Sequence, residues 1–142
     1  MNKQICVVCF ANYCRSPVAQ VILSKLHPKI NVISAGLKPI PKANMDERSA
    51  SFLNKNNYSF EVHNPKSISD KIMNESNLVY AIDHFILMSL NRQFPNHSKK
   101  IKLLTHQSPQ INLADPYTVC DDEYWKIMKK IEMVCSAIEL EM

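Results

Sequence analysis

The run Val7-Val8-Cys9-Phe10-Ala11-Asn12-Tyr13-Cys14-Arg15-Ser16-Pro17 is the most informative segment of this chain. It ends a short apolar segment, residues 5–8, which predicts a buried strand that stops at Cys9. Ser16 and Pro17 then open a helical pattern, with Ser16 expected as the N-cap and Pro17 as the first helical residue. A strand, a polar loop and a helix N-terminus in this order predict a cradle for an anion.

Apolar segments and helical patterns alternate along the rest of the chain. Strands are expected at residues 5–8, 30–34, 78–82 and 101–104, and helices at 17–26, 45–54, 68–73, 84–94 and 121–140. This alternation favours an α/β fold, in which helices cover both faces of a parallel sheet. Such sheets bind ligands beyond the carboxyl ends of their strands, which is where Cys9 lies.

The composition is that of one compact domain, expected to span residues 1–142. Hydrophobic residues make up 46% of the chain, enough for a core, but no apolar run has membrane-spanning length and no signal peptide is recognisable. We therefore expect a cytoplasmic protein without a membrane partner. The net charge of +4 suits an anionic substrate. We interpret the mild cluster of Lys99, Lys100 and Lys102 as a solvated face, and expect no nucleic-acid partner.

A single glycine, Gly36, is present in the chain. Neither of the glycine-rich nucleotide-binding patterns, G-x-G-x-x-G or G-x-x-x-x-G-K, occurs, which excludes those phosphate loops. An anion bound at residues 9–16 must therefore be held by a loop without glycine.

Five cysteines in a chain of this class indicate free thiols rather than a disulfide framework. Cys6 and Cys9 form a C-x-x-C pair, but no second close pair completes a zinc site. Cys6 also lies in a strand pattern, where a small buried side chain is expected. We expect neither a metal nor a cofactor.

Cys9 and Arg15 have the chemistry needed to attack a phosphate ester. A cysteine is a nucleophile as the thiolate, and a helix N-terminus, backbone N–H groups and the Arg15 guanidinium all favour negative charge at Cys9. The same donors can hold the oxygens of a phosphoryl group, and arginine binds two of them at once. Ser16 either donates its hydroxyl to the thiolate or caps the helix, and the sequence does not separate these roles.

Asp115-Pro116-Tyr117 is the candidate for proton transfer. Asp115 would act first as a general acid towards the leaving oxygen and then as a general base for water. The alternative interpretation is an ordinary turn, because aspartate-proline pairs are common in turns.

The residues from Cys9 to Pro17 resemble the signature of the low-molecular-weight protein tyrosine phosphatase family, a cysteine, usually a glycine, an asparagine and then Cys-Arg-Ser-Pro. The resemblance runs along the whole chain. It includes Ser34-Ala35-Gly36 after the second strand, Asp83 after the third strand and Asp115-Pro116-Tyr117.

The resemblance implies a single three-layer domain with a four-stranded parallel sheet in the order 2-1-3-4. It implies hydrolysis of phosphotyrosine in proteins, and of small aryl phosphates, through a cysteinyl-phosphate intermediate. Cys9 would be the nucleophile, Arg15 the phosphate-binding residue and Asp115 the general acid, with phosphate or sulfate able to occupy the cradle. The expected substrate-binding residues are Phe10, Ala11, Asn12, Tyr13, Cys14, Ser16 and Tyr117, and Ser34 would support the loop through Asn12.

Several residues depart from the family pattern. Ala11 replaces the usual glycine and would be strained if its φ were positive. Thr118 follows Tyr117 where a second aromatic is frequent, and residues 37–42 contain no aromatic. In the last respect the chain is similar to bacterial members associated with capsule and exopolysaccharide export, which implies a phosphotyrosine protein, in particular a bacterial tyrosine autokinase, as partner.

Two other functions remain open, an arsenate reductase on the same fold and a non-catalytic phosphotyrosine-binding regulator. The first needs two further redox cysteines near the cradle, and residues 70–95 contain none. A separate hypothesis concerns Cys14, which would trap oxidised Cys9 as a disulfide. The alternative interpretation is that Cys14 only fills a small buried space.

Overall fold

Four parallel strands form one sheet in the computed structural model, which describes residues 2–140 and 142. They are β1 (Gln4–Cys9), β2 (Asn31–Gly36), β3 (Leu78–Ala81) and β4 (Ile101–Leu103), in the order β2-β1-β3-β4. All three neighbouring pairs are parallel. The predicted sheet and its order are therefore confirmed.

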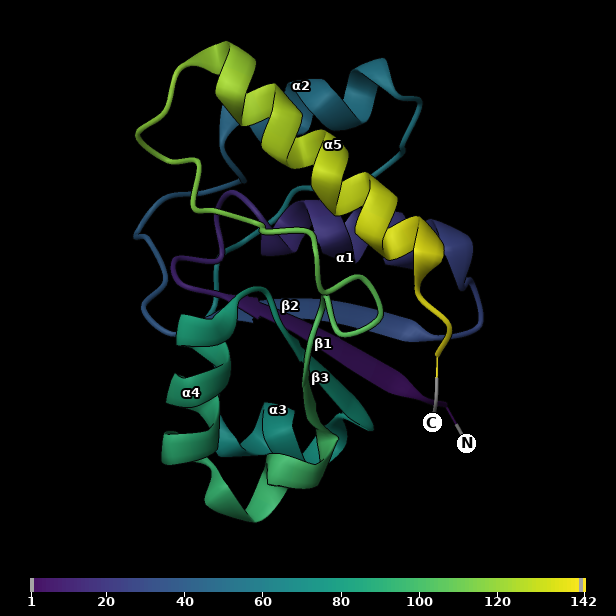
Figure 1. The fold of residues 1–142 in the computed structure, drawn as a ribbon, viewed down its shortest axis with the longest axis vertical. Coiled ribbons are helices and arrows are strands. Elements are labelled where there is room, and N and C mark those ends of the chain that lie inside the picture. Colours follow the sequence, from purple (N-terminus) through teal and green to yellow (C-terminus); the bar gives the residue numbers. More distant parts are fainter. Residues whose placement is uncertain (1, 141) are drawn as a thin grey trace.

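Helices cover both faces of this sheet (Figure 1). One face carries α1 (Ser16–Leu26), α2 (Glu47–Lys55) and α5 (Asp121–Ala137), and the other carries α3 (Asp70–Glu75) and α4 (His84–Gln93). Helix α1 packs on β1 and β2, whereas α4 packs on β3 and β4. The three-layer α/β architecture follows the alternation of strand and helix patterns in the sequence.

Strand β1 lies in the middle of the core. Ile5, Cys6, Val7 and Val8 are completely buried, because helices cover the strand on both sides. Burial also raises the pKa of the Cys6 thiol to about 12. Cys6 is therefore a small core side chain, as its position in the strand predicted. Cys9 is the last residue of β1 and lies at the carboxyl end of the sheet.

The boundaries of several elements differ from the prediction for local reasons. Helix α5 ends at Ala137 rather than at residue 140, because Ile138 turns to extended backbone while its side chain stays buried. Helix α3 begins at Asp70, because the Ser69 hydroxyl caps it and Ile68 N–H donates to Gly36 O instead. A 3-10 helix over Pro95–Lys100, which was not predicted, leads into β4.

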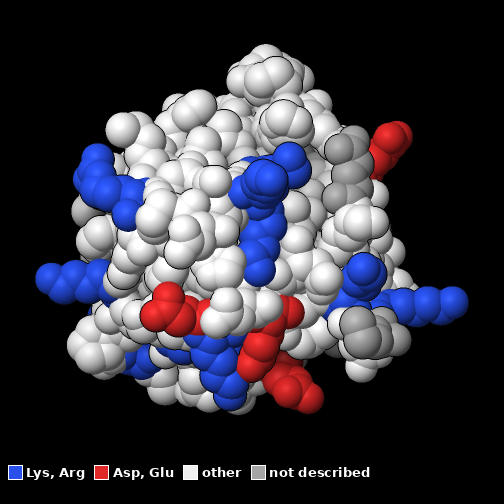
Figure 2. All heavy atoms as spheres, turned by 90° about the horizontal axis from the view of Figure 1, so that it is seen from below, with Lys and Arg blue, Asp and Glu red and all other residues white. Residues whose placement is uncertain are grey.

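Charges on the end of the molecule that carries α3 and α4 are mixed. Figure 2 shows basic and acidic side chains in small groups with uncharged surface between them. Within the cluster of three lysines, the Lys100 ammonium donates to Met73 O and Ser76 O and so binds the C-terminus of α3. No helix in the described part of the chain is long and apolar enough to cross a membrane.

Candidate active site

Residues 9–16 connect β1 to α1 and form the cradle. Asn12, which is fully buried, takes left-handed backbone geometry with φ of 53°. Among the residues that the structure describes, the non-glycine residues with positive φ are all asparagines, Asn12, Asn44 and Asn57. Ala11 is not one of them, so the alanine that replaces the family's glycine avoids the strain of a left-handed conformation.

The Asn12 side chain holds the cradle in shape. Its amide Nδ2 donates to Ser16 Oγ at 2.9 Å and to Ser34 Oγ at 3.0 Å, so the contact expected between Asn12 and Ser34 is present. Its Oδ1 accepts from Lys66 N–H at 3.0 Å. Every polar atom of this buried amide therefore has a partner, which makes the loop rigid without glycine.

Gly36 is the last residue of β2 and lies beside the cradle. A Cβ atom at this position would lie 2.8 Å from Phe10 O and 2.9 Å from Asn12 N. These are backbone atoms, which a side chain cannot push aside cheaply. The one glycine of the chain is thus placed where the backbone of the cradle leaves no room for a side chain.

Cys9 is 2% exposed, and its Sγ lies 2.9 Å from Ser16 Oγ. Ser16 is the first residue of α1, the cap residue is Arg15 and no side chain caps this helix. The predicted N-cap role of Ser16 is therefore wrong, and so is Pro17 as the first helical residue. The hydroxyl faces the sulfur instead, where it donates to Cys9 whenever that residue is a thiolate.

Arg15 is 3% exposed and ties three segments together. Its Nη1 donates to Asp83 Oδ2 and to Leu113 O, both at 2.8 Å. Asp83 in turn accepts from Ile86 N–H and caps α4. The guanidinium is thereby fixed between the end of β3 and the loop that carries Asp115.

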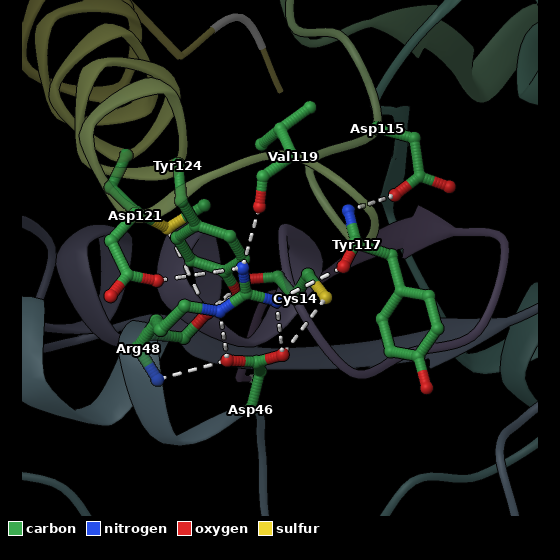
Figure 3. Close-up of polar contacts among 10 residues, drawn as sticks. Cys14, Asp46, Arg48, Asp115, Tyr117, Val119, Asp121 and Tyr124 are labelled. Atoms are coloured by element: carbon green, nitrogen blue, oxygen red, sulfur yellow. Dashed lines mark hydrogen bonds and ion pairs between the residues drawn. The ribbon is translucent and has the colours of Figure 1, made fainter.

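One cavity of about 430 Å³ contains the three residues expected to carry the chemistry, Cys9, Arg15 and Asp115. Its other lining residues are Phe10, Ala11, Cys14, Lys38, Pro39, Ile40, Pro41 and Tyr117. Asp115 is exposed, and its Oδ1 accepts from Tyr117 N–H at 3.1 Å (Figure 3). The turn expected at Asp115 is present, and it leaves the carboxylate at the mouth of the cavity.

Tyr117 and residues 38–41 line this cavity from two different loops. The Tyr117 and Tyr13 rings meet edge to face with centroids 6.2 Å apart. The other loop contributes no aromatic ring to the cavity wall, because its lining residues are Lys38, Pro39, Ile40 and Pro41. The arrangement can receive a flat aryl group above the cradle.

Segment 57–66 contacts the cradle at Asn12 and supports it. The sequence did not predict this contact. His63 Nε2 donates to Asn12 O at 2.7 Å, and burial lowers the pKa of His63. Between this segment and α1 lies a larger cavity of about 840 Å³, whose lining includes none of Cys9, Arg15 and Asp115. The three residues expected to carry the chemistry therefore line the smaller cavity and not the larger one.

Cys14 and Arg48 complete the surroundings of the site. Cys14 is buried, its Sγ lies 3.9 Å from Asp46 Oδ2, and burial raises the pKa of its thiol to about 12. Arg48 was not singled out in the sequence, yet it binds Tyr117 O and Val119 O of the loop around Asp115. Its partners lie 69 and 71 residues away, so no local pattern announces the contact.

The comparisons with known proteins agree with this geometry. The family model of the low molecular weight phosphotyrosine protein phosphatases matches residues 4–141. The low molecular weight protein-tyrosine-phosphatase Wzb of Salmonella typhi is 30% identical over 132 residues, which cover 93% of this chain and 89% of the relative.

Solved structures share this fold. The tyrosine phosphatase AmsI of Erwinia amylovora has a TM-score of 0.89 with 26% identity, and the match covers 96% of this chain and 90% of that one. The tyrosine phosphatase Wzb of Escherichia coli K30, solved with sulphate, also has a TM-score of 0.89, with 24% identity over 96% and 95% of the two chains. The chain therefore belongs to the low molecular weight phosphotyrosine protein phosphatase family.

Proposed function

We propose that this protein-tyrosine phosphatase works through a phosphate ester of Cys9, with Arg15 as the phosphate clamp and Asp115 as the proton donor. Its substrates are phosphotyrosine in proteins and small aryl phosphates. The observation that carries the proposal is the single cavity in which the thiol, the guanidinium and the carboxylate meet. Each of the three groups has a distinct part in phosphoryl transfer to a thiol.

In the first step the Cys9 thiolate attacks phosphorus. The sulfur–phosphorus bond forms as the bond to the tyrosine oxygen breaks, and Asp115 gives its proton to the leaving oxygen. In the second step the Asp115 carboxylate takes a proton from water, which attacks phosphorus. The sulfur–phosphorus bond then breaks, inorganic phosphate forms, and Cys9 returns as the thiolate.

Arg15 holds the transferred group through these steps. Its Nη1 is occupied by Asp83 and Leu113, so the three N–H groups on Nε and Nη2 remain for phosphate oxygens. The cradle adds backbone N–H donors from Phe10, Ala11, Asn12, Tyr13, Cys14 and Ser16. The Ser16 hydroxyl donates to the Cys9 thiolate, and Tyr117 contacts the aryl ring. Ser34 acts only through Asn12, whose conformation it supports.

We propose the partner and the location from the resemblance of the chain to bacterial family members. A phosphotyrosine protein is the substrate, and we propose a bacterial tyrosine autokinase in the cytoplasm. The absence of an aromatic residue from loop 37–42 supports the assignment, since this is where the chain is similar to family members of polysaccharide export.

Para-nitrophenyl phosphate and a phosphotyrosine peptide test the function. We expect turnover of both by the wild type, and none by Cys9→Ser, which should stay folded and still bind phosphate analogues. Arsenate with a thiol reductant is the control, because an arsenate reductase would consume thiol whereas a binding module would turn over neither substrate. Hydrolysis by Cys9→Ser above background would remove Cys9 as the nucleophile.

A series of substituted phenyl phosphates tests Asp115. Asp115→Asn should lower kcat/KM about 10²- to 10⁴-fold for substrates with poor leaving groups, and progressively less as the leaving group becomes more acidic. Equal dependence on leaving-group acidity in wild type and variant would leave Asp115 with its turn role only.

A further inference from the structure

Exposed apolar side chains gather beside the active site. Eight large hydrophobic residues are exposed in residues 2–140 and 142, and four of them, Phe10, Phe85, Met88 and Tyr117, belong to the cavity wall or to the helix beside it. Phe85 and Met88 are 62% and 60% exposed, although both lie on α4, whose Ile86 and Leu90 are buried. Exposed apolar side chains that adjoin a cavity can bury an apolar group of a ligand bound there.

These side chains form a continuous path away from the cavity. The Phe10 ring lines the cavity and lies 6.4 Å from the Phe85 ring, centroid to centroid. Met88 follows Phe85 by one helical turn and therefore shares its face of α4. An extended peptide advances about 3.3 Å per residue, so the step between the two rings is about two residues long.

We propose that Phe85 and Met88, next to Phe10, form a docking surface for a bulky apolar side chain of the substrate, one to three residues from the phosphotyrosine. The occupant is thus a segment of the phosphoprotein itself. The proposal rests on the proposed function, because the phosphotyrosine must occupy the cradle for its neighbours to reach α4. Continuity of the surface with the cavity through Phe10 identifies this occupant.

Paired phosphotyrosine peptides test the surface. One set carries leucine in turn at each of the three positions on either side of the phosphotyrosine, and the matched set carries serine. We expect Phe85→Ser and Met88→Ser to lower kcat/KM about 3- to 10-fold for the best leucine peptide, as loss of a partly buried apolar contact implies. The serine peptides and para-nitrophenyl phosphate should be unaffected.

Met133→Ser is the matched control, because Met133 is equally exposed but lies on α5. Equal losses for leucine and serine peptides, or no loss for either, overturn the docking surface. If the wild type itself hydrolysed neither peptides nor para-nitrophenyl phosphate, the proposed function would fail, which is a different result.

A second, independent observation concerns Arg48 on α2. Its guanidinium donates to Val119 O at 3.0 Å and to Tyr117 O at 3.1 Å, so it binds the loop just after Asp115 (Figure 3). Arg15 binds the same loop at Leu113 O, just before Asp115. The loop is therefore held by an arginine on each side of the proposed acid.

The Arg48 side chain is itself held firmly. Asp46 accepts from its Nε and Nη2, both at 3.0 Å, and the guanidinium lies 4.0 Å from the centroid of the Tyr124 ring. Asp46 N–H also donates to Tyr13 O of the cradle at 3.0 Å. Arg48 and Asp46 thus connect the cradle to the acid loop without touching the reacting atoms.

We infer that Arg48 is a positioning residue, which aligns Asp115 with the leaving group. This inference rests on the proposed acid role of Asp115. A lysine keeps the charge but not the fork that binds Asp46 and two carbonyls together. We expect Arg48→Lys to lose about 10-fold in kcat/KM with phenyl phosphate, part of the roughly 10²- to 10⁴-fold that general acid catalysis supplies, and little with the most acidic phenols.

A double-variant cycle separates positioning from mere stability. In the Asp115→Asn background, Arg48→Lys should cause no further loss of kcat/KM with phenyl phosphate, whereas its effect on thermal stability should be the same in both backgrounds. Lys126→Arg is the control, because Lys126 forms only an exposed ion pair with Glu123. Losses that add in the double variant, or that are uniform across leaving groups, overturn the inference. So does an Asp115→Asn variant with unchanged leaving-group dependence, since Arg48 would then have no acid to align.

Discussion

Asn12 and Ser16 together explain how a cradle without glycine is built. Asn12 supplies the left-handed backbone, and its side chain joins Ser16 and Ser34. Ser16 does not cap the helix, and its hydroxyl faces the sulfur of Cys9. The sequence predicted Asn12 and its partner Ser34, but it left Ser16 with two roles, because a hydroxyl at a helix start serves either one equally well. Only the position of the sulfur separates them.

Arg15→Lys tests the clamp. Because Asp83 and Leu113 occupy one nitrogen of the guanidinium, a lysine ammonium would have to choose between these partners and the phosphate. We expect kcat/KM for para-nitrophenyl phosphate to fall about 10²- to 10³-fold, as for loss of a transition-state donor. Arg92→Lys, at an exposed position on α4, is the control. Near-wild-type kcat/KM in Arg15→Lys would contradict the clamp.

Cys14→Ser tests the redox hypothesis. We propose that Cys14 traps peroxide-oxidised Cys9 as a disulfide, so dithiothreitol should restore wild type fully and Cys14→Ser much less. Because burial raises the pKa of Cys14 to about 12, its thiolate fraction, and with it the protection, should grow from pH 7 to pH 9. Phosphate should slow inactivation of both proteins. Cys120→Ser, at an exposed position, is the control, and equal recovery of wild type and Cys14→Ser would end the hypothesis.

The strands and helices could be predicted because each is encoded within its own residues. Strand β1 reads as a continuous apolar run, and α4 begins at the capping Asp83. The contacts of segment 57–66 and of Arg48 could not be predicted, because their partners are about 50 to 70 residues distant and the chain gives them no periodic pattern. Long-range packing, rather than local propensity, places these two supports.

His63 makes the support behind the cradle sensitive to pH. Burial is the main cause that lowers its pKa, and the charge of Lys66 adds to it, while the hydrogen bond to Asn12 O opposes it. The unfolded chain therefore binds the proton more readily, so this part of the stability is complete above about pH 6.5 and is lost as the pH falls.

Urea unfolding between pH 8 and pH 5 measures this effect. His63→Gln keeps an N–H donor but does not titrate, so its free energy of unfolding should fall less than that of wild type below pH 6.5. The exposed His106, changed to glutamine, is the control. Parallel pH profiles for wild type and His63→Gln would refute the role of His63.

The fold brings the site together at the carboxyl end of the sheet. The first strand delivers the thiol, the first helix begins beside it, and the loop before the last helix returns the carboxylate. Arg15 and Arg48 tie these distant segments to one another, so the sheet order predicted from the resemblance also determines which residues can meet. The sequence therefore predicted that Cys9, Arg15 and Asp115 come together, while the contact of Arg48 with the loop around Asp115 was not predicted.

A covalent phosphate ester on Cys9 is the central claim of the proposed mechanism, and it can be trapped. Wild type is mixed rapidly with para-nitrophenyl phosphate, quenched by a denaturant while turnover continues, and digested for mass spectrometry. We predict that phosphate is found on the peptide that contains Cys9 and that its amount follows the release of the first equivalent of nitrophenol. Continued turnover with no phosphate on Cys9, or with phosphate on another residue, would contradict the account.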